Sequence, residues 1–185
     1  MKLVRQVLEH NRRWVAQRGT ALSKHPARQI AIFTCMDTRL VDFLEPALGI
    51  GRGDAKIIKN AGATLVDPGG SVVRSLVVAI YALGCKEVFV VGHRDCGMSQ
   101  IRESRLHGVM RRRGVPESAI SALRPSLRQW VGAFRNHNRN VRQVVDLLRA
   151  NPLIARSVPI HGLMFDPASG RLDLVRDGYR ARRKR

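Results

Sequence analysis

The sequence predicts an α/β fold in which a mostly parallel central sheet is flanked by helices. Two observations support this prediction: apolar runs with little alternation, which are typical of strands covered on both faces, and helical segments between those runs. The order strand, helix, strand, helix, strand favours parallel pairing through right-handed crossovers. An N-terminal helical arm and a C-terminal antiparallel hairpin complete the predicted fold class.

Three strands are expected in the first half of the chain and two near its end. The run Glu-Val-Phe-Val-Val at 87–91 is the clearest, the run at 29–34 is also apolar, and 54–59 contains two adjacent isoleucines. The runs 158–165 and 172–175 flank the turn-forming sequence Asp-Pro-Ala-Ser-Gly, which predicts a terminal hairpin.

Helical spacing of apolar residues and helix stop signals predict helices between these strands. They are expected at 2–17, 41–48, 72–83 and 141–149. The stretch 99–137 is rich in arginine, and we expect a helical excursion there that is broken at Pro116 and Pro125.

Length and composition indicate one domain with appended ends. A chain of 185 residues can bury a sizeable core. We expect a helical arm over 1–22, a single α/β domain over 23–178, and a basic, disordered tail over 179–185. No apolar run approaches the ~20 residues that a membrane span needs, and no secretory signal is evident, so a cytoplasmic protein is expected.

The chain is strongly basic, with 33 basic against 14 acidic residues and a formal net charge of +19. Such an excess attracts anions and raises their encounter rate. Nucleic acid is an unlikely partner, because no nucleic-acid-binding signature accompanies the charge, but the charge keeps it open. A small anionic substrate is the other interpretation.

Two short motifs follow two of the predicted strands: Cys35-Met36-Asp37-Thr38-Arg39 and His93-Arg94-Asp95-Cys96-Gly97. In parallel sheets, ligands bind beyond the carboxyl ends of the strands, where both motifs and Asn60 are expected to meet. Disulfides are not expected from an odd cysteine count in a chain without an export signal. Cys85 is better explained as a small buried hydrophobe.

Two thiolates and one imidazole, from Cys35, Cys96 and His93, form a ligand set that suits zinc and leaves one coordination position open. A water in that position can become a hydroxide nucleophile. Five other histidines lack ligand spacing and are expected on the surface or in the core: His10, His25, His107, His137 and His161. Asp95 is expected to form a turn.

Asp37 and Arg39 stand beside the first thiolate. Arg39 can pair bidentately with Asp37 and hold it ionised. Asp37 can then accept the proton of the zinc-bound water; alternatively, it can become the fourth zinc ligand and close the site. The sequence leaves both arrangements open.

These motifs resemble those of the β-class carbonic anhydrases. The resemblance lies in Cys35–Arg39, in Lys59-Asn60-Ala61-Gly62 and in Gly92–Met98, and it extends over about 29–100 and the closing hairpin. It implies one zinc per chain held by Cys35, His93 and Cys96, with Asp37 and Arg39 as the catalytic dyad. It also implies reversible hydration of carbon dioxide to bicarbonate, and a homodimer or higher homo-oligomer whose N-terminal helix wraps the partner.

Three further residues are expected to contact substrate: Asn60, Gly62 and Gly97. Arg94 departs from the small or polar residue that the resemblance leads us to expect, and it adds a cation beside the metal loop. Two alternative functions stay open. One is a zinc hydrolase of a related linear molecule, carbon disulfide or carbonyl sulfide. The other is a non-enzymatic zinc- or polyanion-binding protein.

Overall fold

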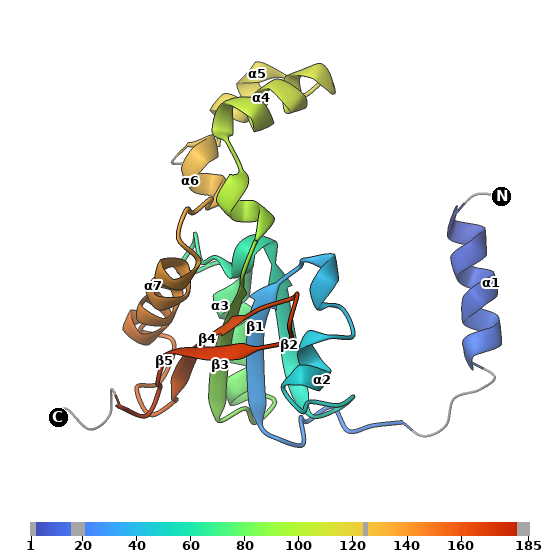
Figure 1. Cartoon of the computed structure of the whole chain (residues 1–185), viewed down its shortest axis with the longest axis vertical. Coiled ribbons are helices and arrows are strands. Elements are labelled where there is room, and N and C mark those ends of the chain that lie inside the picture. Colours follow the sequence, from blue (N-terminus) through green and yellow to red (C-terminus); the bar gives the residue numbers. More distant parts are fainter. Residues whose placement is uncertain (1–2, 16–20, 124–125, 181–185) are drawn as a thin grey trace.

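A five-stranded sheet forms the centre of the chain in the computed structural model, which describes residues 3–15, 21–123 and 126–180 (Figure 1). Its strands are β1 (Ile30–Cys35), β2 (Ala55–Asn60), β3 (Glu87–His93), β4 (Ile160–Phe165) and β5 (Leu172–Arg176). Their spatial order is β2-β1-β3-β4-β5. The first four are parallel and β5 pairs antiparallel with β4, which confirms the predicted fold class and the terminal hairpin.

The strand register brings the predicted site to one edge of the sheet. Cys35, the last residue of β1, lies beside Asn60 at the end of β2, and His93 at the end of β3 lies beside Phe165. The carboxyl ends of neighbouring parallel strands therefore carry the two motifs side by side, as expected for a site in an open α/β sheet.

Two helices, α3 (Ser71–Tyr81) and α7 (His137–Ala150), cover one face of the sheet. Their apolar side chains pack with alternate residues of the strands, such as Phe33 and Val90, in one buried cluster. The opposite face of the sheet carries Ile32 and Val91 and is covered by the segment that follows β1.

That covering segment differs from the predicted helix at 41–48. It contains a 3-10 turn, η1 (Thr38–Leu40), and a shorter helix, α2 (Leu44–Ala47). Asp42 lies between them with a φ of 53°, a left-handed conformation that interrupts a right-handed helix. The periodicity of the sequence was compatible with one helix, but the backbone at Asp42 divides it.

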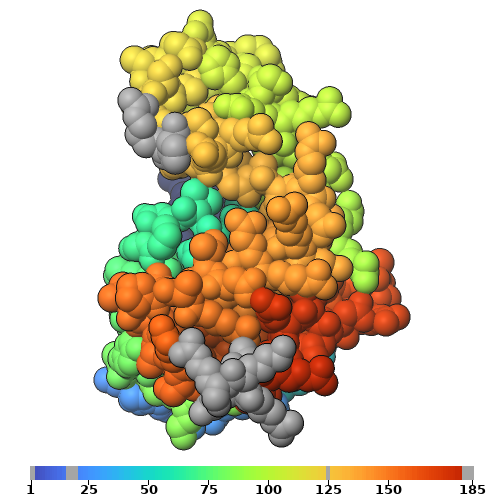
Figure 2. Space-filling model, turned by 90° about the vertical axis from the view of Figure 1, so that its left-hand side faces the viewer, coloured from blue at the N-terminus to red at the C-terminus, as the bar shows by residue number. Residues whose placement is uncertain are grey.

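The Arg-rich excursion forms a lobe that projects from the body of the molecule (Figures 1 and 2). The lobe consists of α4 (Glu103–Arg112), α5 (Glu117–Ser121) and α6 (Leu127–Val131). Pro116 caps the N-terminus of α5, so the predicted break there is confirmed, whereas Pro125 falls outside the described residues.

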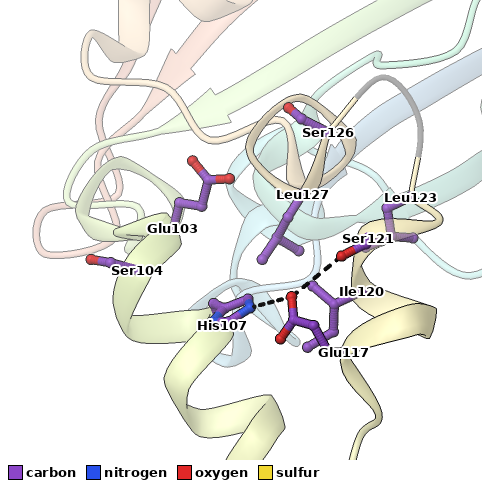
Figure 3. Close-up of a pocket in the computed structure, with 9 residues that line it drawn as sticks. All are labelled: Glu103, Ser104, His107, Glu117, Ile120, Ser121, Leu123, Ser126 and Leu127. Atoms are coloured by element: carbon purple, nitrogen blue, oxygen red, sulfur yellow. Dashed lines mark hydrogen bonds and ion pairs between the residues drawn. The ribbon is translucent and has the colours of Figure 1, made fainter.

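A cavity of about 500 Å³ lies between the three helices of the lobe and contains none of the predicted site residues (Figure 3). Glu117 lines this cavity. Its carboxylate accepts a hydrogen bond from Arg111 at 2.7 Å and lies 3.1 Å from the Nε2 atom of His107. These contacts join α4 to α5, so His107 has a partner within the lobe and is remote from the predicted ligands.

At the N-terminus, α1 (Leu3–Val15) stands apart from the body in Figure 1, and none of its residues is buried. A helix is thus present where the sequence predicted one at 2–17, and residues 2, 16 and 17 lie outside the described residues. No helix among the described residues is long and apolar enough to cross a membrane.

The C-terminal boundary lies later than predicted. Tyr179, which the sequence grouped with the basic tail, donates a hydrogen bond from its hydroxyl to Glu87 at 2.7 Å and packs edge-on against His161. The folded body thus extends past residue 178. Tyr179 and Arg180 of the predicted tail are described, and 181–185 lies outside the described residues.

Candidate metal centre

The three predicted ligands meet at the carboxyl edge of the sheet. The ligand atoms of Cys35, His93 and Cys96 lie within 4.8 Å of one another, and all three side chains are buried. Cys35 ends β1, His93 ends β3, and Cys96 follows in the next turn. Asp95 makes that turn with a φ of 51°, as predicted, and so brings Cys96 back toward His93.

The geometry of these atoms fits a zinc ion. The Nδ1 atom of His93 lies 2.9 Å from the carbonyl oxygen of Arg94, which requires a donor, so Nδ1 carries the proton and Nε2 carries the lone pair. Nε2 is buried and has no hydrogen-bond partner among the residues that the structure describes. The two sulfurs are 3.9 Å apart, close to the ~3.8 Å expected for two thiolates on a tetrahedral zinc.

Hydrogen bonds hold the Cys35 sulfur and the backbone of Cys96. The N–H of Gly62 donates to the Sγ atom of Cys35 at 3.2 Å, and the N–H of Cys96 donates to the Nε2 atom of His137 at 3.2 Å. The Cys96 thiol beside Cys35 lowers the pKa of Cys35, and the Gly62 N–H acts in the same direction. Hydrogen bonding of this kind favours the thiolate, which is the form that binds metal.

Gly62 must be glycine for this contact. Its φ is 77°, and an added Cβ atom would lie 2.8 Å from the Cγ atom of Met98. A side chain here would both strain the backbone and push on the residue that follows the metal loop.

Arg39 joins the two metal loops. Its guanidinium and Asp37 form a bidentate pair, with contacts of 3.0 Å and 2.9 Å. The same guanidinium donates to the carboxylate and to the backbone carbonyl oxygen of Asp95, both at 2.8 Å. The hydrogen bonds from Arg39 lower the pKa of Asp37 to about 2, so this carboxylate is ionised at neutral pH.

Asp37 also faces the metal position. Its Oδ2 atom lies 3.7 Å from the Nε2 atom of His93. Oδ1 already accepts two hydrogen bonds, from the backbone N–H and the Nε–H of Arg39, whereas Oδ2 accepts one. Because a carboxylate oxygen has two acceptor positions, Oδ2 has one left for a group at the site.

The residues predicted to contact substrate have structural contacts of their own. Both polar atoms of the Asn60 side chain form hydrogen bonds with the backbone of Thr64. The backbone N–H of Gly62 donates to the Sγ atom of Cys35. Gly97 begins the 3-10 turn η3 (Gly97–Gln100). These contacts shape the loops around the site, and the predicted contacts of the three residues with substrate stay predictions.

Other residues agree with or extend the sequence interpretation. Cys85 is buried in the core, as predicted, and burial raises the pKa of its thiol. The extra cation Arg94 is paired with Asp173 of β5 at 3.0 Å. Sequence reasoning missed three residues, which are Asp95, His137 and Asn140. The carboxylate of Asp95 accepts a hydrogen bond from Arg39, His137 contacts the backbone of Cys96, and Asn140 contacts the backbone of Gly62. Asp95 could have been suspected from its place between two ligands; for the other two, the sequence carries no distance signal.

Comparison with known proteins agrees with this geometry. The family described as "Carbonic anhydrase" matches residues 30–172 of the chain. The chain is also 31% identical to "Beta-carbonic anhydrase 1" of Mycobacterium tuberculosis, over 81% of this chain and 83% of that protein. The chain belongs to the β-carbonic anhydrase family. Members of this family are zinc enzymes, and the Cys-His-Cys group described above could hold such an ion.

Two further relatives cover nearly the whole chain. A Bacillus subtilis protein named "Putative carbonic anhydrase YtiB" is 42% identical over 97% of this chain and 99% of its own length. The crystal structure of β-carbonic anhydrase isoform I from Trichomonas vaginalis superposes with a TM-score of 0.91 and 38% identity, covering 97% of this chain and 100% of that chain.

Proposed function

We propose that this chain catalyses the reversible hydration of carbon dioxide to bicarbonate and a proton, with one zinc ion per chain held by Cys35, His93 and Cys96. One observation carries the proposal: a buried imidazole nitrogen, without a hydrogen-bond partner in the described part of the chain, faces two sulfurs, with an ionised carboxylate 3.7 Å away. When bound, zinc supplies the Lewis acid that makes water a nucleophile near neutral pH.

Asp37 orients the attacking water in this proposal. Its pKa of about 2 makes it a weak base, so it accepts a hydrogen bond and does not store a proton. With the second acceptor position of Oδ2 open, it can point the water's remaining lone pair toward carbon dioxide. The released proton then passes to solvent or buffer.

Arg39 fixes that carboxylate. Its five N–H groups form a planar fork, and the structure uses them on both Asp37 and Asp95. Asp37 is thereby held in the Arg39 pair beside the ligand set, with its Oδ2 atom 3.7 Å from the Nε2 atom of His93. This supports the open arrangement, in which the fourth coordination position is left to water.

Homodimerisation is the second part of the proposal. The apolar side chains of α1 are exposed, with 73% exposure at Leu3, 58% at Val7 and 53% at Leu8. A helix with such a face gains stability when another surface covers it. A second copy of the chain is the occupant we propose.

Three buried free cysteines suit a reducing compartment such as the cytoplasm.

Hydrolysis of carbon disulfide is the second candidate function. It is favoured by one observation: the chain is 31% identical to "Carbon disulfide hydrolase" of Saccharolobus solfataricus over 78% of this chain and 76% of that protein. The same nucleophile would serve both reactions, and access to the site would decide between them.

Stopped-flow assays of the zinc-loaded protein with each substrate test the proposal. We expect rapid hydration of carbon dioxide, little turnover of carbon disulfide, and loss of hydration when a chelator removes zinc. Turnover of carbon disulfide alone would support the second candidate. Absence of both activities in a protein with a full complement of zinc would contradict both.

A further inference from the structure

The first turn of α7 contacts the loop of Cys96 and the turn that follows β2. The Nε2 atom of His137 accepts the backbone N–H of Cys96 at 3.2 Å. Three residues further along, the Nδ2 atom of Asn140 donates to the carbonyl oxygen of Gly62 at 3.2 Å. Residues three apart lie on the same side of a helix, so one helical face reaches both segments.

The second of these contacts leads directly to a sulfur. Gly62 accepts from Asn140 through its carbonyl oxygen and donates from its N–H to the Sγ atom of Cys35. Asn140 is 8% exposed, so loss of its amide would leave the Gly62 carbonyl buried without this partner. Asn140 therefore influences Cys35 through one intervening residue.

The helix that carries these side chains is firmly placed. The side chain of Asn136 caps its N-terminus by accepting the N–H of Arg139 at 2.9 Å. Val141 is fully buried against Gly92 and Gly162, where an added Cβ atom would lie 2.5 Å and 2.8 Å from its methyl groups. Glycines on two adjacent strands thus let α7 approach the sheet closely beside His93.

The ring of His137 has further support. Phe134 packs edge-on against it, with ring centroids 5.6 Å apart, and the same phenylalanine borders Gly62. The imidazole is therefore held by Phe134 on one side, and its Nε2 atom is directed at the backbone N–H of Cys96.

We propose that His137 and Asn140 are positioning residues that hold the two sulfur ligands at the spacing a metal ion needs. The inference rests on the proposed zinc site and assigns these residues no contact with substrate. Groups that orient metal ligands from outside the coordination sphere typically contribute tenfold to hundredfold in metal affinity.

The test measures zinc affinity of the whole chain by chelator competition, with cobalt(II) substitution as a spectroscopic readout. His137→Phe keeps an aromatic ring and removes the acceptor; we expect zinc binding to weaken roughly tenfold or more. His137→Gln restores an acceptor oxygen near the position of Nε2 and should bind zinc nearly as tightly as wild type. The sulfur-to-cobalt absorption should change in His137→Phe and recover in His137→Gln.

Asn140→Leu removes the amide while keeping similar volume, and the same weakening is expected; Asn140→Ser is the second variant should the leucine protein not fold. Asn138→Ala, an exposed change on the same turn, is the matched control and should behave as wild type. Folding of each variant is checked by circular dichroism.

Wild-type zinc affinity and an unchanged cobalt spectrum in folded His137→Phe or in the folded Asn140 variant would overturn the inference while leaving the zinc site standing. A wild-type protein that binds no zinc would overturn the proposed function, and this inference with it.

Discussion

Hydrogen-bonding capacity assigns the roles of single side chains at this site. Arg39 has enough donors to hold Asp37 and Asp95 together, and Asp37 keeps one acceptor position on Oδ2. His93 has two ring nitrogens, of which one is used by a backbone carbonyl and the other faces the sulfurs. Asp37 and His93 thus each keep one unused position, and the two atoms concerned, Oδ2 and Nε2, lie 3.7 Å apart.

Substitution of Asp37 by asparagine should lower carbon dioxide hydration roughly a hundredfold or more, because the amide lacks the charge and the acceptor geometry that orient water. Zinc content should stay close to that of wild type, since Asp37 lies outside the ligand set. Stopped-flow rates with metal analysis check both. Asp42→Asn, an exposed change nearby, is the control; equal loss in both variants would contradict the role of Asp37.

The buried side chain of His161 should make the free energy of unfolding depend on pH. Its Nδ1 atom accepts the N–H of Gly178 at 3.1 Å, and burial lowers its pKa, although Glu87 opposes this. Because the folded pKa lies below the unfolded value of about 6.5, the unfolded chain binds the proton more readily. Stability contributed by neutral His161 is therefore present above that pH and is lost as the pH falls through the folded pKa.

Urea denaturation at several pH values, at constant zinc, measures this slope. His161→Asn can keep an acceptor for Gly178 without titrating, so its free energy of unfolding should fall less steeply between neutral and mildly acidic pH than that of wild type. Parallel slopes in the two proteins would exclude His161 as the source.

At the scale of elements, the site depends on how closely a helix approaches a strand end. The register of the parallel strands places Cys35, at the end of β1, and His93, at the end of β3, at the same edge of the sheet. The position of α7, by contrast, depends on glycine at position 92, directly before a ligand, where Val141 occupies the space of a side chain.

Gly92→Ala should destabilise the fold by about 1–3 kcal/mol, because the added methyl group meets Val141 and forces α7 outward. Combining it with Val141→Ala should relieve the clash, so the double variant should be more stable than the sum of the two single changes predicts. Denaturant unfolding of the four proteins measures this coupling. Strict additivity would show that α7 does not press on Gly92.

At the scale of the whole molecule, the body carries the site while α1 extends away from it (Figure 1). In the dimer that we propose, a second copy of the chain covers the exposed apolar side chains of α1. Val7→Glu combined with Leu8→Glu should therefore shift the protein from dimer toward monomer in light scattering. Gln6→Glu adds charge away from these apolar side chains and should leave the mass unchanged. A monomeric wild type would contradict the proposed dimer.

The sequence allowed the sheet, the order of its strands along the chain and the grouping of Cys35, His93 and Cys96 to be predicted, because strand ends and short motifs are local signals. It could not locate His137 or Asn140, since their contacts join segments 41 and 78 residues apart. The division of the predicted helix at Asp42 was likewise hidden, because a left-handed residue leaves the apolar periodicity unchanged. The boundary of the tail was placed too early because Tyr179 directly precedes the basic run that begins at Arg180, and its hydrogen bond with Glu87 leaves no signal in the sequence.

X-ray absorption at the zinc edge of the purified protein tests the central claim most directly. We predict two sulfur neighbours at about 2.3 Å and two lighter neighbours, nitrogen or oxygen, at about 2.0–2.2 Å. Cys96→Ser should reduce the sulfur count by one. Protein without zinc, or a shell in which the two sulfurs are missing, would contradict it.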